Sequence, residues 1–188
     1  MQVKVEISAR HLHLCQKDLE KLFGSGYRLK IKNKLSQAGE FAARETVRLS
    51  GKKANLSRVR IIGPTRKKTQ VELSMTDCRK LGIDAPIRLS GDVLGTPGIK
   101  IIGPKGIVNL KQGVIVAKRH LHLSTKKAKE LKLKNNDKVK VKIKSERALI
   151  FEEIIVRVAD NFDFNVHLDT DEANAAGLKS CGKGELII

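Results

Sequence analysis

Apolar and polar residues alternate along most of the chain, which is the pattern of β-strands with one buried face. In residues 138–144, for example, lysines occupy one face and Val139, Val141 and Ile143 the other. Turn signals such as Gly63-Pro64 separate such segments. The pattern predicts strands at residues 3–7, 46–50, 57–62, 69–73, 86–90, 99–102, 113–117, 138–144, 148–158, 165–168 and 185–188.

Helical patterns are few and short. They predict helices at residues 16–23, 76–81, 125–131 and 170–176. Ser124 can cap the third of these, and Gly82 and Gly177 follow the second and the fourth where a helix commonly ends. Many short strands with a few short helices indicate a mostly β protein built of small barrels whose ends the helices cover.

Two internal repeats divide the chain. Arg-His-Leu-His-Leu occurs at 10–14 and again at 119–123, each time after a predicted strand and before a predicted helix. Arg-Leu-Ser-Gly at 48 and 88 is followed thirteen residues later by Ile-Ile-Gly-Pro, which indicates a strand–loop–strand unit used twice in one domain. Residues from about 10 to 117 are therefore interpreted as one barrel and 118–188 as a second module. The first strand could pair with either.

Composition narrows the protein class. The 188 residues contain 40% apolar residues, enough for a core, but only 3% aromatic ones. No apolar run approaches the ~20 residues of a membrane helix, and no secretory signal is recognisable. Three widely spaced cysteines form no Cys-x-x-Cys motif, which argues against a disulfide framework and fits a reducing cytoplasm.

The formal net charge of +18 points to a polyanionic partner or to a lysine-rich solvated surface. Proteins that bind single-stranded nucleic acid also use aromatic stacking platforms. Five Phe and one Tyr, none interleaved with a basic run, do not supply them. The solvated surface is therefore favoured, and no nucleic-acid partner is expected.

Four of the five histidines form two His-x-His pairs, His11 with His13 and His120 with His122. Residues two apart on an extended chain point to the same side, so each pair presents two imidazoles on one face. Neighbouring imidazoles cannot both be protonated at low cost, whereas a shared metal ion binds both in the neutral form. A single His-x-His pair would be interpreted as two surface histidines without a metal. Two pairs in equivalent contexts predict two metal sites, and zinc accepts this geometry.

Each pair needs at least one more ligand. His167 is the remaining histidine and can complete one site. For the other site the residues leave two alternatives, Glu72, which interrupts an apolar strand, and Cys15, which lies two residues beyond His13. An acidic run after His167 is interpreted as charge at a helix N-terminus rather than as ligands: Asp169, Asp171 and Glu172.

Several segments together resemble the PduL-type phosphate propanoyltransferases. They are Arg-His-Leu-His-Leu at 10–14 and 119–123, Thr-Gln-Val-Glu-Leu-Ser-x-Thr-Asp at 69–77, Ser-Gly-Asp-Val-Leu-Gly-Thr-Pro-Gly at 90–98, and His-Leu-Asp-Thr-Asp-Glu-Ala-Asn-Ala-Ala-Gly at 167–177. They span essentially the whole chain in the family's order, so the resemblance is more specific than any single motif.

The resemblance implies a phosphotransacylase, an acyltransferase that interconverts a short-chain acyl-CoA and phosphate with an acyl phosphate and CoA. Propanoyl and acetyl are the expected acyl groups, and phosphate is expected to attack the thioester directly. The implied fold has two small closed β-barrels capped by short helices, one made of residues 1–9 and 118–188 and the other of 10–117. The N-terminal strand then crosses over to the C-terminal barrel.

The resemblance also implies cofactors and roles. Two zinc ions lie between the barrels in this family, and CoA is substrate or product. The implied ligands are His11, His13 and Glu72 for the first zinc, and His120, His122 and His167 for the second. Arg66 matches the family's phosphate-binding, catalytic arginine, although by itself it is one member of a basic run at 66–68.

Some positions depart from the family. Ala38 stands where proline is common and Cys15 where serine is common. Family members packaged in microcompartments carry an N-terminal targeting extension, whereas this chain starts at its first strand, so a free cytoplasmic enzyme without a membrane partner is expected. A homo-oligomer and coupling to an acyl kinase are compatible with the resemblance.

Two other functions fit parts of the sequence. A two-metal hydrolase of thioesters or phosphate esters would use the same histidines and would need no phosphate as co-substrate. A basic, zinc-containing nucleic-acid-binding protein would use the +18 charge, with closed four-ligand zinc sites and binding that weakens steeply with salt.

Overall fold

The computed structural model describes all residues from 1 to 188, and the chain divides into two compact units. Met1–Ala9, Ser36–Ala38 and Lys118–Ile188 form the terminal unit. Arg10–Leu35 and Gly39–Ala117 form the central unit. Each unit has its own hydrophobic core built mainly from Val, Ile and Leu.

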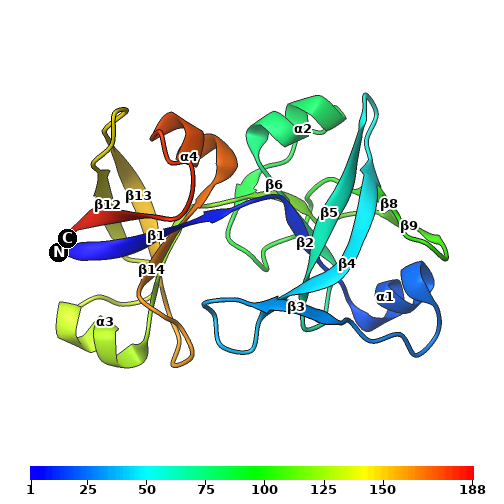
Figure 1. Cartoon of the computed structure of the whole chain (residues 1–188), viewed down its shortest axis with the longest axis horizontal. Coiled ribbons are helices and arrows are strands. Elements are labelled where there is room, and N and C mark those ends of the chain that lie inside the picture. Colours follow the sequence, from blue (N-terminus) through cyan, green and yellow to red (C-terminus); the bar gives the residue numbers. More distant parts are fainter. The chain divides into compact units, whose positions relative to one another are not determined.

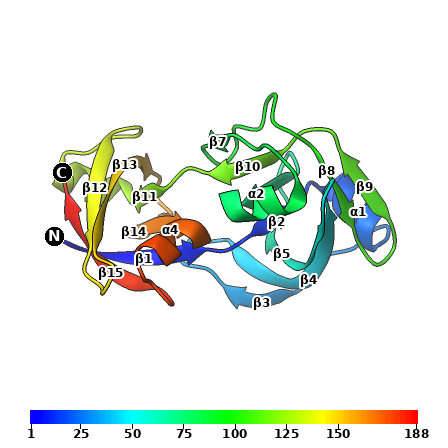
Figure 2. The same ribbon diagram turned by 90° about the horizontal axis from the view of Figure 1, so that it is seen from above.

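The terminal unit is a closed barrel of six strands (Figures 1 and 2), which follow one another in the order β1-β14-β11-β13-β12-β15. Their bounds are β1 Gln2–Ser8, β11 His120–Leu123, β12 Lys138–Ile143, β13 Leu149–Val158, β14 Asn165–Asp169 and β15 Gly182–Ile187. Strand β12 shows why the sequence folds this way, because Val139, Val141 and Ile143 are buried while the lysines between them are exposed.

The N-terminal strand belongs to this barrel. Strand β1 pairs in parallel with β14 and antiparallel with β15. The crossing of the first strand to the C-terminal barrel is therefore confirmed. The two ends of the chain meet there, since the Met1 amino group donates a hydrogen bond to the Leu186 carbonyl.

Two short helices accompany the barrel strands. Helix α3, Thr125–Leu131, follows β11, and the Ser124 side chain accepts a hydrogen bond from the Lys127 backbone, as an N-cap should. Helix α4, Thr170–Ala175, follows β14 and lies beside β1 and β14 (Figure 2). Gly177, just beyond α4, has a positive φ of 66°, which explains a glycine at this position.

The central unit contains a nine-stranded sheet in the order β7-β10-β6-β2-β5-β4-β8-β9, with β3 paired to β4. The bounds are β2 His11–His13, β3 Ile31–Lys34, β4 Phe41–Ser50, β5 Asn55–Gly63, β6 Gln70–Leu73, β7 Ile87–Arg88, β8 Ile99–Ile102, β9 Ile107–Leu110 and β10 Val114–Ala117. Helix α1 spans Gln16–Phe23 and packs near β9, and α2 spans Met75–Leu81 and ends at Gly82 in a left-handed conformation.

The mostly β class with a few short helices is confirmed. The terminal barrel is closed, whereas the sheet of the central unit curls (Figures 1 and 2) without β7 and β9 joining in a hydrogen-bonded ladder. No helix of the structure combines the length and the apolar character that crossing a membrane requires.

The second sequence repeat corresponds to strands, but its two copies are not equivalent. In the first copy β4 and β5 pair with each other as an antiparallel hairpin. In the second copy β7 pairs with β10, while β8 pairs with β4 and β9. Both copies have the expected strand–loop–strand order along the chain, but their strands pair differently, because equal spacing along the chain does not determine strand partners.

Candidate metal centres

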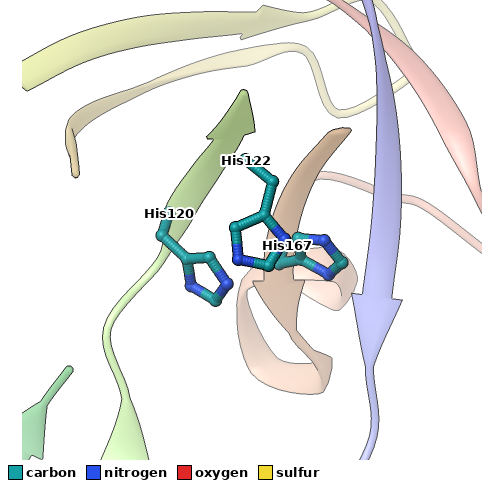
Figure 3. A group of neighbouring side chains, drawn as sticks. All are labelled: His120, His122 and His167. Carbon is teal, nitrogen blue, oxygen red and sulfur yellow. The ribbon is translucent and has the colours of Figure 1, made fainter. Parts of the chain in front are cut away.

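The terminal unit brings together its three histidines. His120 and His122 lie on β11, and His167 lies directly opposite His120 on the antiparallel strand β14. The three rings converge from these two neighbouring strands (Figure 3). Ring centroids are 4.6 Å apart for His120 and His122, 5.0 Å for His120 and His167, and 4.7 Å for His122 and His167. One nitrogen of each ring lies within 4.8 Å of a nitrogen of both others.

The His122 ring is buried, with 2% of the residue exposed. Burial lowers the pKa of His122 to about 2, and nearby His120, His167 and Arg157 act in the same direction. The imidazole is therefore neutral at pH 7, the form that metal ligation requires.

The central unit assembles a second group in the same way. His11 and His13 lie on β2, and Glu72 lies directly opposite His11 on the antiparallel strand β6. The Glu72 carboxylate is 3.5 Å from Nε2 of His11 and 3.9 Å from Nε2 of His13. Glu72, rather than Cys15, joins the two histidines within 4.8 Å.

His13 is as buried as His122. Burial lowers the pKa of His13 to about 3, helped by neighbouring His11 and Arg66, although Glu72 opposes the shift. This group therefore also offers neutral imidazole, together with a carboxylate that adds negative charge next to a bound cation.

Both groups fit zinc by the chemistry of their donors. Ligand atoms about 2.0–2.2 Å from a tetrahedral zinc ion lie about 3.3–3.6 Å from one another, close to the spacing around Glu72. In addition, Nε2 of His122 is buried and makes no hydrogen bond. Since buried polar atoms nearly always have a partner, this nitrogen fits a role in metal binding. Three protein ligands would leave a fourth position open, as in catalytic zinc sites.

The acidic run after His167 has another role. The Asp169 side chain accepts a hydrogen bond from the Glu172 backbone, and the Glu172 side chain accepts one from the Asp169 backbone. This capping box confirms that these residues start helix α4.

Comparison with known proteins identifies the family. The family model of phosphate propanoyltransferase matches residues 4–179 of the chain. The chain belongs to this family. Among its relatives, the phosphate propanoyltransferase of Thermotoga maritima is 50% identical over 97% of this chain and 86% of its own length. Those of Leptotrichia buccalis and Listeria monocytogenes are 49% and 45% identical, over 97% and 98% of this chain and 86% and 87% of their own lengths.

Membership of the phosphate propanoyltransferase family makes the chain an enzyme of the acyltransferase class. The arginine expected to bind phosphate, Arg66, lies in the central unit after β5. Its Nη2 donates a hydrogen bond to Glu40 at 2.8 Å, and its Nη1 donates one to the Ser90 hydroxyl at 3.2 Å. About a third of its side chain is exposed, so the guanidinium can meet a ligand from solvent.

Sequence reasoning missed the residues that hold Glu72. The Ser90 hydroxyl donates to Glu72 Oε1 at 2.9 Å, and the Gln70 amide donates to the same oxygen. Gln70 is itself fixed, because its carbonyl accepts a hydrogen bond from the Gly91 backbone at 2.7 Å. Both donors lie in segments that carried the family resemblance, but nothing in their local pattern pointed to this contact. With Oε1 held in this way, Oε2 faces His11.

Proposed function

We propose that this phosphate propanoyltransferase family member is a phosphotransacylase that uses two zinc ions. It would interconvert a short-chain acyl-CoA, with propanoyl or acetyl as the acyl group, plus phosphate with acyl phosphate plus CoA. The proposed ligands are His11, His13 and Glu72 for one zinc, and His120, His122 and His167 for the other. The position of both metals between the two barrels stays a prediction.

One observation carries the proposal. A chain that matches the family over residues 4–179 gathers all five of its histidines and one carboxylate into two three-ligand groups. At the buried positions the imidazole is kept neutral. Such groups suit a cation that takes nitrogen and oxygen ligands and keeps one position for a substrate.

The proposed reaction is a direct transfer. A phosphate oxygen attacks the thioester carbonyl carbon, the new C–O bond forms, the C–S bond breaks, and CoA leaves as its thiolate. When bound, zinc ions supply Lewis-acid stabilisation of negative charge on the carbonyl oxygen and the departing sulfur. No protein nucleophile is acylated in this scheme.

Arg66 is proposed to bind and orient the attacking phosphate. Its planar guanidinium can hold two phosphate oxygens at once, which lowers the repulsion between the phosphate and the developing oxyanion. The incoming phosphate replaces the Glu40 carboxylate as the partner of Nη2, while Ser90 keeps its bond to Nη1. Because Ser90 also bonds to Glu72, the phosphate-binding arginine and a metal-binding carboxylate share one hydroxyl.

The test is an assay of the zinc-loaded protein with acetyl-CoA and propanoyl-CoA in phosphate buffer, following free thiol with a chromogenic reagent and acyl phosphate as its hydroxamate. We expect thiol and acyl phosphate to appear in equal amounts and only when phosphate is present. Absence of thiol release from every short acyl-CoA would refute the proposal.

The same assay separates the alternatives. A hydrolase would release thiol equally well without phosphate and would form no acyl phosphate. A nucleic-acid-binding protein would show no turnover, but tight binding to DNA or RNA that weakens steeply as salt is raised. A cytoplasmic location, a homo-oligomer and a coupled acyl kinase stay predictions that this assay does not address.

A further inference from the structure

Residues Ser36–Ala38 lie with the terminal unit although the chain on both sides of them belongs to the central unit. The Ser36 hydroxyl donates a hydrogen bond to the Glu6 carboxylate at 2.6 Å. The Ala38 backbone makes two further bonds to Asn161: the side-chain Nδ2 of Asn161 donates to the Ala38 carbonyl at 3.2 Å, and the Ala38 N–H donates to the backbone carbonyl of Asn161 at 3.4 Å. The residue between these anchors, Gln37, is thus held from both sides.

Gln37 contacts one of the proposed metal ligands. The amide nitrogen of its side chain, Nε2, lies 3.2 Å from Nδ1 of His122. The same ring is covered by Phe162, which stacks on it at a centroid distance of 3.9 Å and an interplanar angle of 21°. Phe162 is next to Asn161, so one short loop packs on the ring and also holds the segment that carries Gln37. The His122 imidazole is therefore fixed on one face by Phe162 and at Nδ1 by Gln37.

The partner at Nδ1 determines which ring nitrogen can bind a metal. A neutral imidazole carries one proton, and only the nitrogen without it can be a ligand. For His120 the choice is settled, because its Nδ1 lies 2.9 Å from the Lys118 carbonyl, which can only accept. The His120 proton is therefore on Nδ1, and Nε2 keeps its lone pair.

For His122 the choice depends on the amide of Gln37. A side-chain amide carries a donor, the NH2 group, and an acceptor of similar size, the carbonyl oxygen. A half turn about the Cγ–Cδ bond makes the two groups exchange places. With the amide nitrogen toward Nδ1, as in this structure, the ring accepts and its proton lies on Nε2. With the amide oxygen toward Nδ1, the ring donates and Nε2, which is buried and makes no hydrogen bond, has a free lone pair.

We propose that Gln37 is a positioning residue for metal binding: after a half turn of its amide, the amide oxygen accepts the Nδ1 proton of His122 and holds the ring in the tautomer whose Nε2 is a ligand. This inference rests on the proposed zinc site of the terminal unit. Hydrogen bonds of this kind to ligating histidines fix the ring and raise its basicity, and their loss typically weakens metal affinity by about 10–100-fold.

Two variants separate hydrogen bonding from packing. Gln37→Leu keeps a side chain of similar size and removes the acceptor, whereas Gln37→Glu keeps an acceptor and removes the donor. Both are made in a His13→Ala background, which leaves the terminal-unit site as the one to be measured. Zinc affinity is determined by competition with a chromophoric chelator, without acyl-CoA. Nitrogen NMR shifts of the zinc-free proteins report the tautomer of His122.

We expect Gln37→Leu to weaken zinc binding by about 10–100-fold and Gln37→Glu to preserve it, with the proton on Nδ1. Unchanged affinity in Gln37→Leu, or equal losses in both variants, would overturn the inference. The control is Gln37→Leu in a His122→Ala background, where the affinity of the central-unit site should not change. Because affinity is measured without substrate, a failure of the transferase assay would refute the proposed function and leave this result standing.

Discussion

Glu72 and His167 hold equivalent positions in two similar sets of strands. Glu72 lies opposite His11 across the antiparallel β2–β6 ladder, and His167 lies opposite His120 across the antiparallel β11–β14 ladder. In each set the first histidine of a His-x-His pair and a third potential ligand are thus direct cross-strand neighbours, whose side chains share a face. The repeated sequence Arg-His-Leu-His-Leu therefore marks a repeated local geometry.

The arginine of each repeat belongs to this geometry. Nε of Arg10 donates to Asp77 at 2.9 Å, and Nη1 of Arg119 donates to Glu172 at 2.8 Å. Each acid lies in the first turn of the helix that follows the strand carrying the third potential ligand, α2 after β6 and α4 after β14. Each arginine thereby ties the start of its histidine strand to that helix.

Loss of either arginine should destabilise the protein. Arg119→Gln leaves Glu172 mostly buried without its cation, and burial already raises the pKa of Glu172. We expect Arg10→Gln and Arg119→Gln each to lower the free energy of unfolding by about 1–3 kcal/mol, as measured by urea denaturation. Arg88→Gln is the matched control, because the Arg88–Asp92 pair is about half exposed on both sides and should contribute less than about 1 kcal/mol.

The charge of Glu72 should matter for metal affinity. Glu72→Gln keeps the size of the side chain but removes the negative charge, and an amide oxygen is a weaker zinc ligand than a carboxylate. We expect zinc affinity of the central-unit site to fall at least about 10-fold, since outer contacts alone are worth that much, with the other zinc unaffected. Chelator competition measures both. Asp84→Asn, an exposed carboxylate in the same unit, should change neither affinity, and an equal loss there would show a general charge effect instead.

Single histidine variants should remove one metal each. His13→Ala and His122→Ala each delete a buried proposed ligand, in different units, so zinc content should fall from about two ions per chain to about one in both cases. Most transferase activity should be lost, while far-UV circular dichroism stays unchanged because each core is built from other residues. Each variant is the control for the other. Full activity, or two zincs, in either would contradict the ligand assignment.

The sequence predicts helices and strands whose signals lie within one segment better than it predicts which distant strands pair. Helices α1 and α3 were expected with the bounds observed, because amphipathic spacing and a Ser124 cap are signals within one segment. Strand β3 was missed, since all four of its residues are exposed and show no alternation. The open ladder of the central unit could not be predicted either, because closure depends on which distant strands pair.

The same distinction holds for the candidate site. Spacing alone indicates that each His-x-His pair shares a face, and Glu72 stands out because its charge interrupts an apolar strand. Gln37 gave no such signal. It lies 85 residues from His122 in sequence, in a segment whose position depends on contacts with residues near both ends of the chain. Residues that orient a ligand from a loop leave no periodic pattern.

Arg66 should affect phosphate more than acyl-CoA. Arg66→Lys keeps the positive charge but cannot bind two oxygens in one plane, so we expect KM for phosphate to rise about 10-fold or more, with KM for acyl-CoA nearly unchanged. Initial rates at varied concentrations of each substrate measure the difference. Lys67→Gln, an exposed neighbour in the same basic run, is the control. If both variants raise KM for phosphate equally, Arg66 contributes only to the general positive field.

Stability of the zinc-free protein should fall as pH decreases below about 6.5. The pKa of His13 is about 3 in the folded protein, against an ordinary value of 6.5 in the unfolded chain. Between these values the unfolded chain binds one more proton than the folded protein at this residue, so the free energy of unfolding decreases by about 1.4 kcal/mol for each pH unit lost. The stabilisation is complete above 6.5 and disappears as pH approaches 3. His122, with a pKa of about 2, should behave in the same way in the terminal unit.

Protonation of carboxylates also destabilises many proteins in acid. The contribution of His13 is therefore obtained as the difference between the parent chain and a variant without this histidine. Urea denaturation of zinc-free protein between pH 7 and pH 4.5 gives the slope for the parent chain and for His13→Ala. Because alanine takes up no proton, the slope of the variant should be smaller, by up to about 1.4 kcal/mol per pH unit below pH 6.5. Equal slopes would mean that His13 protonates in the folded protein as easily as in the unfolded chain. In that case the neutral imidazole on which metal binding by this group depends would not be enforced by burial.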